Sequence, residues 1–305
     1  MNNSSLGKGF FYAILAYVTW GVLPLYWKFL AAIDSMHILA FRILLALVLV
    51  GIILIAKKDL IWLSSFKEPK KAALMIMSAL FLTCNWGLYI WTVNSGHTLA
   101  ASLGYYINPL VSISLGLLFF RERLKPLQWA AVIIALAGVV ILTILSGALP
   151  WASLGLAFTF GFYGMLKKKI SLSALESLGA ETLVSVPIGI LLLCLSFQSS
   201  PPVFLGFRGL AYIGALPVHT LVLLCFAGLV STFPLYCFAQ GAKLLPLSAL
   251  GFCQFISPTI SLFLGVFVFG EPFPLHDLIA FPIIWTAVIL YLISLRPSAT
   301  PSREK

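Results

Sequence analysis

Long apolar segments alternate along the chain with short segments that are rich in charged residues or in Pro, Gly and Ser. Most of the apolar segments are about 17 to 25 residues long, which is the length that an α-helix needs to cross the hydrocarbon core of a bilayer. Residues 198–206 fit either a loop or a segment that lies along the membrane interface. The pattern predicts ten helices, at about residues 9–31, 35–56, 72–93, 98–120, 127–146, 150–166, 174–197, 217–240, 246–269 and 277–295.

The composition agrees with this pattern. Of the 305 residues, 61% are apolar and 9% are charged, whereas about a quarter of the residues in soluble domains are charged. The first apolar segment is too long, and too rich in bulky aromatic residues, for a secretory signal peptide, so we expect it to remain as the first span. The sequence therefore predicts an all-α, polytopic membrane protein that is surrounded by the lipid bilayer.

One segment of the chain occurs twice. A twelve-residue segment that ends at Glu122 returns 149 positions later as a segment that ends at Glu271, and Pro109 aligns with Pro258. Chance similarity between helices rich in Leu, Gly and Phe is the alternative explanation, but the prolines in register argue against it. The chain is therefore predicted to consist of two related halves.

The basic residues indicate how these halves are oriented. If the N-terminus is cytoplasmic, 16 of the 19 Lys and Arg residues lie on the cytoplasmic side, where such residues are retained. Arg121, Arg123 and Lys125 follow the first copy of the repeated segment, but no basic residue occupies the equivalent places after the second copy. The sequence thus predicts two inverted-topology repeats of five helices, residues 1–146 and 147–305, with both termini cytoplasmic. Inverted repeats are typical of secondary transporters.

Several other kinds of site are not indicated. The five cysteines form no C-x-x-C pair and the four histidines show no metal-ligand spacing, so we expect neither a disulfide nor a metal or other cofactor. The net charge of +10 is divided among short clusters between apolar segments, which does not fit a nucleic-acid-binding surface.

Two prolines inside predicted helices mark a candidate solute site. Pro109 and Pro258 each remove a backbone hydrogen bond, which a membrane tolerates chiefly where other groups or water satisfy the freed carbonyl. Aromatic and polar residues surround both, so we predict two helix kinks that form the floor of a cavity. The predicted floor consists of Tyr105, Tyr106, Asn108, Phe252, Gln254 and Ser257. The alternative is a plain kink whose aromatic rings pack in the core.

The third predicted helix offers a wall for the same cavity. Asn85 and Tyr89 are four residues apart and share one helical face, and Trp86 lies beside them. We predict that these three residues contact the solute. A membrane Asn commonly forms a hydrogen bond to a neighbouring helix, so for each of these residues helix packing is an equally good explanation.

Arg42 and Glu181 are charged residues predicted to lie inside spans, where a charge is costly enough to suggest a function. Each lies about seven residues, or roughly 10 Å, from the start of its own helix. Because these helices start on opposite faces of a core about 30 Å thick, we expect about 10 Å of depth between the two side chains and no ion pair. Our hypothesis is that Arg42 supplies positive potential to the outer half of the cavity, and that Glu181 supplies a protonatable carboxylate, and so proton coupling, to the inner half.

Snorkelling toward the nearer membrane interface is the alternative for both Arg42 and Glu181. The same behaviour is expected of Lys28, at the outer end of the first helix, and of Lys167 to Lys169, which close the sixth helix. We expect these lysines to anchor the chain at the lipid headgroups rather than to bind solute.

Four long motifs resemble those of the RarD proteins, a bacterial branch of the EamA-domain proteins in the drug/metabolite transporter superfamily. The resemblance extends from the first span to the last, and it implies ten helices in two inverted EamA repeats, a bacterial inner-membrane location and a central cavity with alternating access. It also implies roles for Arg42, in the pair Phe41-Arg42, and for Glu181, in the pair Glu181-Thr182. Phe41 stands where the resemblance predicts His. The motifs lie at residues 85–94, 101–110, 155–164 and 250–259.

RarD proteins are named for a link to chloramphenicol sensitivity, and relatives in the superfamily move amino acids and other small metabolites. The resemblance and the aromatic cavity predict a permease for a small organic solute that is amino-acid-like, aromatic or chloramphenicol-like, with export as the direction. The alternative is an integral-membrane enzyme acting on a lipid-linked substrate, which would usually need clustered acids or histidines that the sequence does not show. A gated channel would need a ring of charge or repeated filter carbonyls, which are also lacking.

Overall fold

The computed structural model describes residues 3–30, 33–95, 97–146, 150–196, 203–204, 217–270 and 275–295. Two-residue strands β1 (Leu195–Ser196) and β2 (Val203–Phe204) pair in antiparallel fashion. The remaining elements are helical: α1 (Asn3–Lys28), α2 (Ser35–Ala56), the 3-10 helix η1 (Ile61–Lys67), α3 (Pro69–Asn94), α4 (Thr98–Phe120), α5 (Pro126–Ser146), α6 (Pro150–Lys169), α7 (Ala174–Cys194), α9 (Val218–Leu244), α10 (Leu247–Gln254), α11 (Ile256–Phe263), the π-helical turn η2 (Leu264–Val268) and α12 (Leu275–Ser294).

Eight helical segments among the described residues are long and apolar enough to cross a membrane, which confirms the prediction of an all-α polytopic membrane protein. Several predicted boundaries differ from the observed ones by a few residues. The helix expected over 174–197 ends at Cys194, because the next two residues pair with β2 instead of continuing the helix. Of residues 198–206, Val203 and Phe204 form β2 and the others lie outside the described part of the chain.

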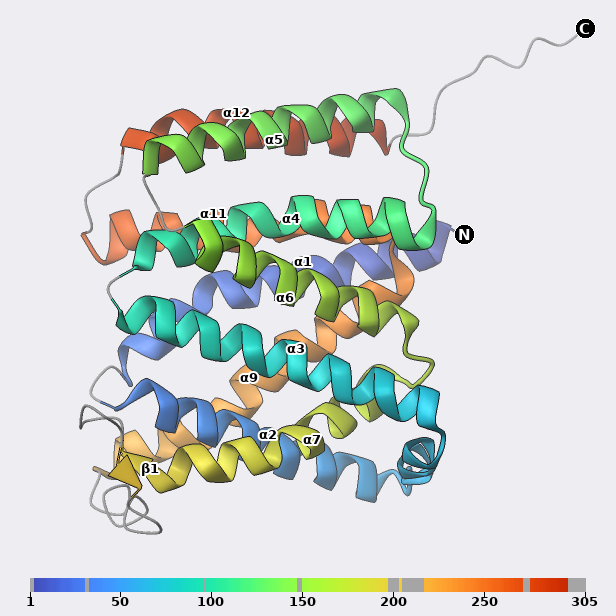
Figure 1. Ribbon diagram of the computed structural model, residues 1–305, viewed down its shortest axis with the longest axis vertical. Coiled ribbons are helices and arrows are strands. Elements are labelled where there is room, and N and C mark those ends of the chain that lie inside the picture. The colour runs from blue at the N-terminus through green and yellow to red at the C-terminus, as the bar shows by residue number, and fades with distance from the viewer. Residues whose placement is uncertain are drawn as a thin grey trace, which may run out of the picture.

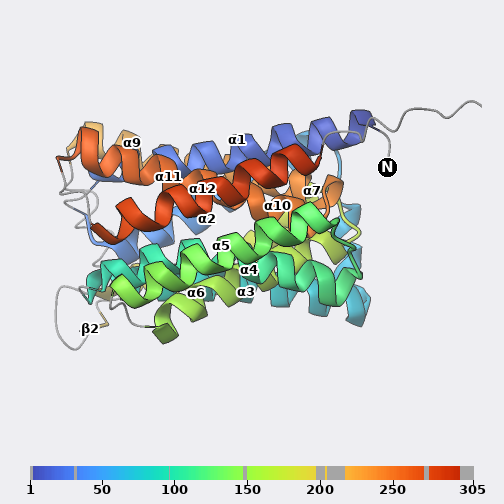
Figure 2. The same ribbon diagram turned by 90° about the horizontal axis from the view of Figure 1, so that it is seen from above.

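The helices lie side by side with roughly aligned axes, so that most of their ends gather at the two ends of one bundle (Figure 1). α5 and α12 pair at one edge of the bundle, and α2 and α7 pair near the opposite edge. Seen from above, α1, α9, α11 and α12 occupy one side, and α3, α4, α5 and α6 occupy the other (Figure 2). α1, from the first half of the chain, therefore lies among helices of the second half, and α6, from the second half, lies among helices of the first.

The contacts between helices repeat when α1 to α5 are exchanged for α6, α7, α9, the pair α10–α11, and α12. α6 packs against α3 and α4, and α1 packs correspondingly against α9 and α11. α2 packs against α9 as α7 packs against α3, while the pairs α2–α7, α4–α10 and α5–α12 join equivalent helices. The two halves thus make equivalent contacts with each other along a shared boundary, which we call the seam.

α4 and α10 run in opposite directions where they meet at the seam. Leu247, at the start of α10, packs against Gly116 near the end of α4, whereas Gly251, one turn later, meets Pro109 and Ile113 in the middle of α4. A methyl group at Gly251 would lie 2.9 Å from the carbonyl oxygen of Pro109. Glycine therefore permits the close approach of these two helices.

The two prolines at this contact have different effects on their helices. α10 ends at Gln254 and α11 begins at Ile256. Pro258 has no N–H for the carbonyl of Gln254, four residues earlier, and its ring crowds that carbonyl, which accounts for the interruption. α4 instead continues through Pro109 as one helix to Phe120.

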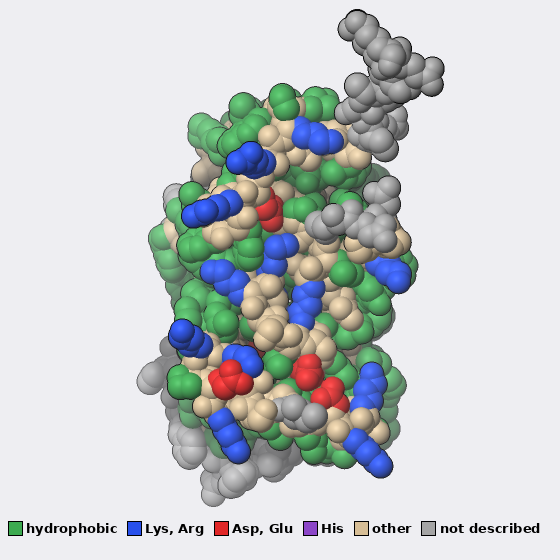
Figure 3. All heavy atoms as spheres, turned by 90° about the vertical axis from the view of Figure 1, so that its right-hand side faces the viewer, with side chains coloured by type: hydrophobic (Ala, Val, Ile, Leu, Met, Phe, Trp, Pro, Cys, Tyr) green, Lys and Arg blue, Asp and Glu red, His purple; other side chains and the backbone are tan. Residues whose placement is uncertain are grey.

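Basic side chains gather at one end of the bundle, which we call the basic end. Figure 3 shows Lys and Arg distributed over this end. η1, the α4–α5 connection and the C-terminal end of α6 lie there (Figure 1). Among the described residues, the basic residue at the opposite end is Lys28, in the last turn of α1. The basic end carries residues such as Lys57, Lys58, Lys67, Lys70, Arg121, Arg123 and Lys169.

Candidate functional site

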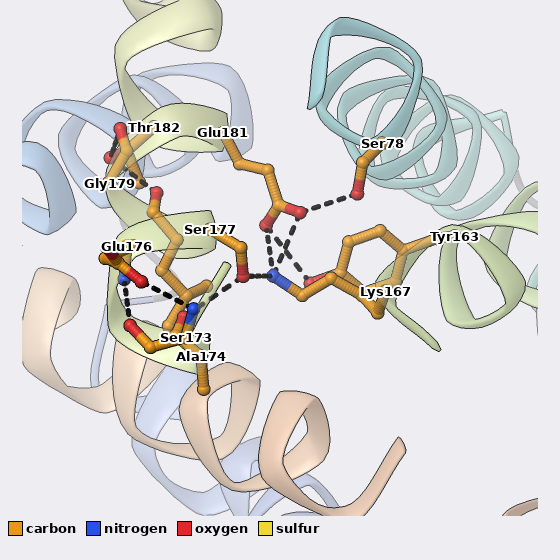
Figure 4. Close-up of polar contacts among 11 residues, drawn as sticks. Ser78, Tyr163, Lys167, Ser173, Ala174, Glu176, Ser177, Gly179, Glu181 and Thr182 are labelled. Atoms are coloured by element: carbon orange, nitrogen blue, oxygen red, sulfur yellow. Dashed lines mark hydrogen bonds and ion pairs between the residues drawn. The ribbon is translucent and has the colours of Figure 1, made fainter. Parts of the chain in front are cut away.

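A buried ion pair lies near the basic end. Lys167 of α6 and Glu181 of α7 are each 1% exposed, and the Lys167 Nζ atom lies 2.9 Å from Oε1 and 3.0 Å from Oε2 of Glu181. The ammonium group also donates to Ser177 Oγ at 2.7 Å, while Ser78 of α3 and Tyr163 of α6 donate to the carboxylate (Figure 4). We call Ser78, Tyr163, Lys167, Ser177 and Glu181 the Glu181 cluster.

The local sequence explains how α7 presents this carboxylate. Ser173 begins α7 with a capping box, in which its side chain and that of Glu176 each accept from the other's backbone N–H. Ser177 and Glu181 then follow with a spacing of four residues, so they share one helical face. That face meets the end of α6, where Lys167 lies.

The expectation that all three lysines at the end of α6 anchor at the headgroups is wrong for Lys167. Successive helical residues point about 100° apart, so the three side chains face different surroundings. Lys169 is exposed, Lys168 donates to the carbonyl of Leu245, and Lys167 alone enters the Glu181 cluster. Because Ser177 and Glu181 satisfy its ammonium group, Lys167 remains inside.

A second cluster surrounds Arg42 of α2. The Arg42 Nε group donates a 2.7 Å hydrogen bond to Ser231 Oγ of α9. The central carbon of the guanidinium group lies 4.5 Å from the ring centre of Trp86 in α3 and 5.0 Å from that of Trp27 in α1. Both distances are within the range of a favourable cation–π contact. Because Ser231 belongs to the second half of the chain, this cluster spans the seam.

Two tyrosines that the sequence assigned to the solute site also belong here. The ring centres of Tyr89 in α3 and Tyr105 in α4 are 5.8 Å apart, and both phenols are close enough to Arg42 to interact with it electrostatically. Tyr89 is 37% exposed and Tyr105 is 40% exposed, so both border accessible space. We define the Arg42 cluster as Trp27, Arg42, Trp86, Tyr89, Tyr105 and Ser231.

A small cavity lies between the two clusters. Trp86 and Ser231 of the Arg42 cluster line it together with Glu181, Ser185 and Thr232. Its volume is about 20 Å³, which is room for about one water molecule, whereas a pocket for a small organic ligand measures about 300 Å³ or more. In this structure the helices therefore leave no room for an organic solute in this cavity.

Arg42 and Glu181 lie on different levels of the bundle. α2 and α7 run in opposite directions (Figure 1), with Leu54 of α2 packed against Gly179 of α7. Glu181 is therefore level with a position on α2 about ten residues beyond Arg42, which corresponds to roughly 15 Å along the helix. Glu181 itself lines the cavity, whereas Arg42 contacts two other lining residues, Trp86 and Ser231. Each charge thus has its own partners.

Polar groups with incomplete hydrogen bonding lie where α1, α4 and α10 meet. Gln254 Nε2 donates to Ser112 Oγ at 2.9 Å, and the Tyr17 hydroxyl lies near the Gln254 side chain. Asn108 Oδ1, Gln254 Oε1 and the Tyr17 hydroxyl are buried without a hydrogen-bond partner among the described residues. Each such group costs about 1–3 kcal/mol. The crossing of α4 and α10 thus contains buried polar groups whose hydrogen bonds are incomplete in this structure.

Other predicted floor residues face away from the Arg42 cluster. The Tyr106 ring packs edge-on against Phe281 of α12, with 5.5 Å between ring centres, and the Phe252 ring stacks on Tyr291 of α12 at 3.8 Å. Ser257 lies at the contact with α1, where its carbonyl oxygen faces Gly21. The predicted floor is therefore divided between the seam and the contact with α12.

Asn85 makes the helix-to-helix contact that the sequence left as its alternative. Its Nδ2 group donates to the carbonyl oxygen of Leu156 and to Thr159 Oγ1, both in α6 and both at 2.9 Å. Asn85 is also buried. The structure thus brings Trp86 and Tyr89, but not the Asn85 amide, to the Arg42 cluster.

Sequence reasoning did not identify Trp27, Ser78, Lys167 or Ser231 as parts of a site. One signal was present in the repeat. Glu181 follows Arg42 by 139 positions, and Lys167 follows Lys28 by the same 139 positions. This shared offset places Lys28 and Lys167 at equivalent positions of the two halves. It would have distinguished Lys167 from its neighbours Lys168 and Lys169.

Comparison with known proteins gives consistent matches over the whole chain. A family model described as "EamA-like transporter family" matches residues 7–144 and again residues 148–293. The chain is 40% identical over 298 residues to "Uncharacterized transporter YojE" of Bacillus subtilis, covering 96% of both proteins. It is 39% identical to "Protein RarD" of Streptomyces exfoliatus, covering 97% of this chain and 92% of that protein. A solved crystal structure with 19% sequence identity covers 97% of this chain and 100% of that chain with a TM-score of 0.68, which shows a shared fold.

Proposed function

Because the chain belongs to the EamA-like transporter family, we propose that it is a RarD-type secondary transporter that moves a small organic solute across the bacterial inner membrane by alternating access, in the direction of export. Relatives are named as transporters, which favours this function over an enzyme acting on a lipid-linked substrate. The proposal depends chiefly on the small cavity between the Arg42 and Glu181 clusters. Helices of both halves line this cavity, and its lining includes Glu181 and two neighbours of Arg42, Trp86 and Ser231.

The proposed topology is ten spans in two inverted repeats, residues 1–146 and 147–305, with the basic end in the cytoplasm. The exchangeable helix contacts and the opposite directions of α4 and α10 support inversion. The concentration of Lys and Arg at one end supports this orientation, and we propose that both termini lie on the cytoplasmic side. Export rests on the resemblance to exporters of the superfamily.

Alternating access requires the small cavity to open first toward one side and then toward the other. In the proposed cycle, the solute contacts Trp86, Tyr89 and Tyr105 and then the incompletely bonded Asn108 and Gln254. Glu181 couples the cycle to protons, because protonation of its carboxylate removes the charge that holds Lys167. We assign Asn85, Tyr106, Phe252 and Ser257 to helix packing around this path.

Counterflow in proteoliposomes tests the proposed function. The purified protein is reconstituted with an unlabelled aromatic or amino-acid-like solute inside, and entry of the labelled solute is measured at two pH values. A carrier gives saturable uptake that the internal solute accelerates, and the label is recovered chemically unchanged. Linear uptake would indicate a channel, and altered label would indicate an enzyme.

Cysteine labelling tests the proposed topology separately. Single cysteines replace Arg121, after α4, and Gly270, after η2, in a variant that lacks the native cysteines. A membrane-impermeant maleimide added to intact cells should label the Gly270→Cys protein and spare the Arg121→Cys protein until the cells are opened. Equal labelling of both in intact cells would contradict inverted repeats.

A further inference from the structure

We infer that the Arg42 cluster binds the carboxylate of the transported solute, and that this solute is a flat aromatic monocarboxylate. The inference rests on the proposed function, because it names the chemical class of that transporter's substrate. It depends on three observations: the unused donors of Arg42, the unequal charges at equivalent positions of the two halves, and the aromatic rings around the guanidinium group.

The guanidinium group of Arg42 has donors to spare. An arginine carries five N–H donors, and within the described part of the chain Arg42 makes one side-chain hydrogen bond, from Nε to Ser231. Among the described acidic residues, none lies within ion-pair distance of it. Arg42 is partly exposed, and no group among the described residues hydrogen-bonds to its two terminal amino groups. Two parallel N–H donors of this kind match the two oxygens of a carboxylate.

The two halves differ in the charges that they carry at equivalent positions. Lys167 and Glu181 neutralise each other in the Glu181 cluster, whereas their equivalents, Lys28 and Arg42, are both cationic. Lys28 turns away and lies 4.0 Å above the Phe269 ring. A charge inside a span is costly unless it is paired. Since the described residues place an anion beside the buried cation of the second half but not beside Arg42, a bound anion would complete the Arg42 cluster.

The rings of the Arg42 cluster select the rest of the ligand. Trp27 and Trp86 cover the guanidinium group, which fixes its plane. Tyr89 and Tyr105 stand beside it and keep exposed ring surface. A flat ring attached to the carboxylate can pack against these phenols. A second negative charge on the ligand would lie among tyrosines without a cation, which favours monocarboxylates.

Matched acid and amide probes test this inference on the purified full-length protein. The probe pairs are benzoate with benzamide and phenylacetate with phenylacetamide, and calorimetry gives the dissociation constants. The amide of each pair keeps the ring and the shape but has no negative charge. We expect the wild-type protein to bind each acid about tenfold or more tightly than its amide, which is the effect of losing a charge-assisted bidentate contact.

Three variants assign the preference to Arg42. Arg42→Gln should bind acid and amide equally, whereas Arg42→Lys should keep a preference for the acid with weaker binding, because it retains the charge without the planar fork. Arg123→Gln removes the same charge from an exposed site at the basic end, and it should behave as wild type. The Arg42→Lys protein keeps the test informative if Arg42→Gln does not fold.

The inference and the proposed function fail in different ways. Equal binding of acids and amides by the wild type, a preference that survives in Arg42→Gln, or failure to bind any of the four probes would overturn the carboxylate site. Counterflow of another solute would then still support a transporter. Acid binding without counterflow of the bound acid would leave the site in place and contradict the transport function.

Discussion

The Arg42 and Glu181 clusters occupy equivalent positions in the two halves but differ in how fully their charges are satisfied. Around Glu181, the carboxylate contacts an ammonium group and two hydroxyl groups, all of them buried. Around Arg42, which is partly exposed, the described residues supply one hydrogen bond and four aromatic neighbours. In the second half, the charges of Lys167 and Glu181 hold helices together. In the first half, the charge of Arg42 is the one that we infer binds a ligand.

The basic end also closes through a second contact across the seam. Both carboxylate oxygens of Glu122, just after α4, accept from the start of α10: Oε1 from the Leu247 N–H at 2.6 Å, and Oε2 from the Ser248 N–H and Oγ at 2.9 and 2.7 Å. Ser78 joins the first half to Glu181 in the same region. The side of the cavity nearer the basic end is thus the more firmly closed side in this structure.

Removing the ammonium group from the Glu181 cluster should have the largest effect. Lys167→Met leaves Glu181 buried without its cation, which should lower the free energy of unfolding by about 3–5 kcal/mol. The double variant Lys167→Met/Glu181→Gln should recover most of this loss, because no uncompensated charge remains. Unfolding in denaturant provides the measurement, with Lys169→Met as the exposed control. Equal stability of Lys167→Met and Lys169→Met would show that the ion pair does not hold the helices.

Crowding the contact between α2 and α9 should disturb the Arg42 cluster and have the second-largest effect on stability. A methyl group at Gly228 would lie 2.7 Å from the backbone carbonyl carbon of Leu45, so Gly228→Ala should cost about 1–3 kcal/mol. It should also weaken binding of benzoate, because this contact holds Ser231 beside Arg42. Gly51→Ala on α2 is the matched control, since nothing lies within 4 Å of that position, and helix propensity should make it neutral or slightly stabilising. A harmless Gly228→Ala would mean that the two helices can separate freely.

The sequence predicted the helices well because membrane spans are set by the length of apolar segments, which is a local property. It also singled out Arg42 and Glu181 as charged residues inside spans, by their depth alone. Partners were harder to predict. Lys167 looks like part of a terminal lysine run, and its burial depends on the face that α7 turns toward α6.

Adjacent residues around the kinks show the same difficulty. Tyr105 joins the Arg42 cluster, whereas Tyr106 packs against Phe281 of α12. Their side chains point about 100° apart on one helix, and the sequence does not specify which of the two faces the seam. That choice depends on how α12 packs beside α4 and α10, a long-range contact that no local pattern encodes.

Loosening the second closure at the basic end should have a moderate effect. Glu122→Ala removes the acceptor for the first N–H groups of α10, which should cost about 0.5–2 kcal/mol. Alkylation of the buried native Cys253 in α10 should become roughly fivefold faster for each kcal/mol lost. Glu176→Ala is the control, because it removes a capping carboxylate that bonds only within α7. Equal Cys253 rates in both variants would assign Glu122 to helix capping and not to closure of the seam.

Deleting the one hydrogen bond of the Arg42 cluster should have the smallest effect. Ser231→Ala leaves the charge and the rings of the cluster in place but removes the acceptor that holds the Nε group of Arg42 in position. Because the guanidinium group is then less well oriented, benzoate should bind about fivefold more weakly while still binding more tightly than benzamide. Ser114→Ala is the control, since the Ser114 hydroxyl bonds a carbonyl of its own helix. Loss of the acid preference in Ser231→Ala would mean that Ser231, and not the charge of Arg42, provides recognition. Retention of that preference would agree with a ligand site in which the charge of Arg42, unpaired among the described residues, recognises the carboxylate.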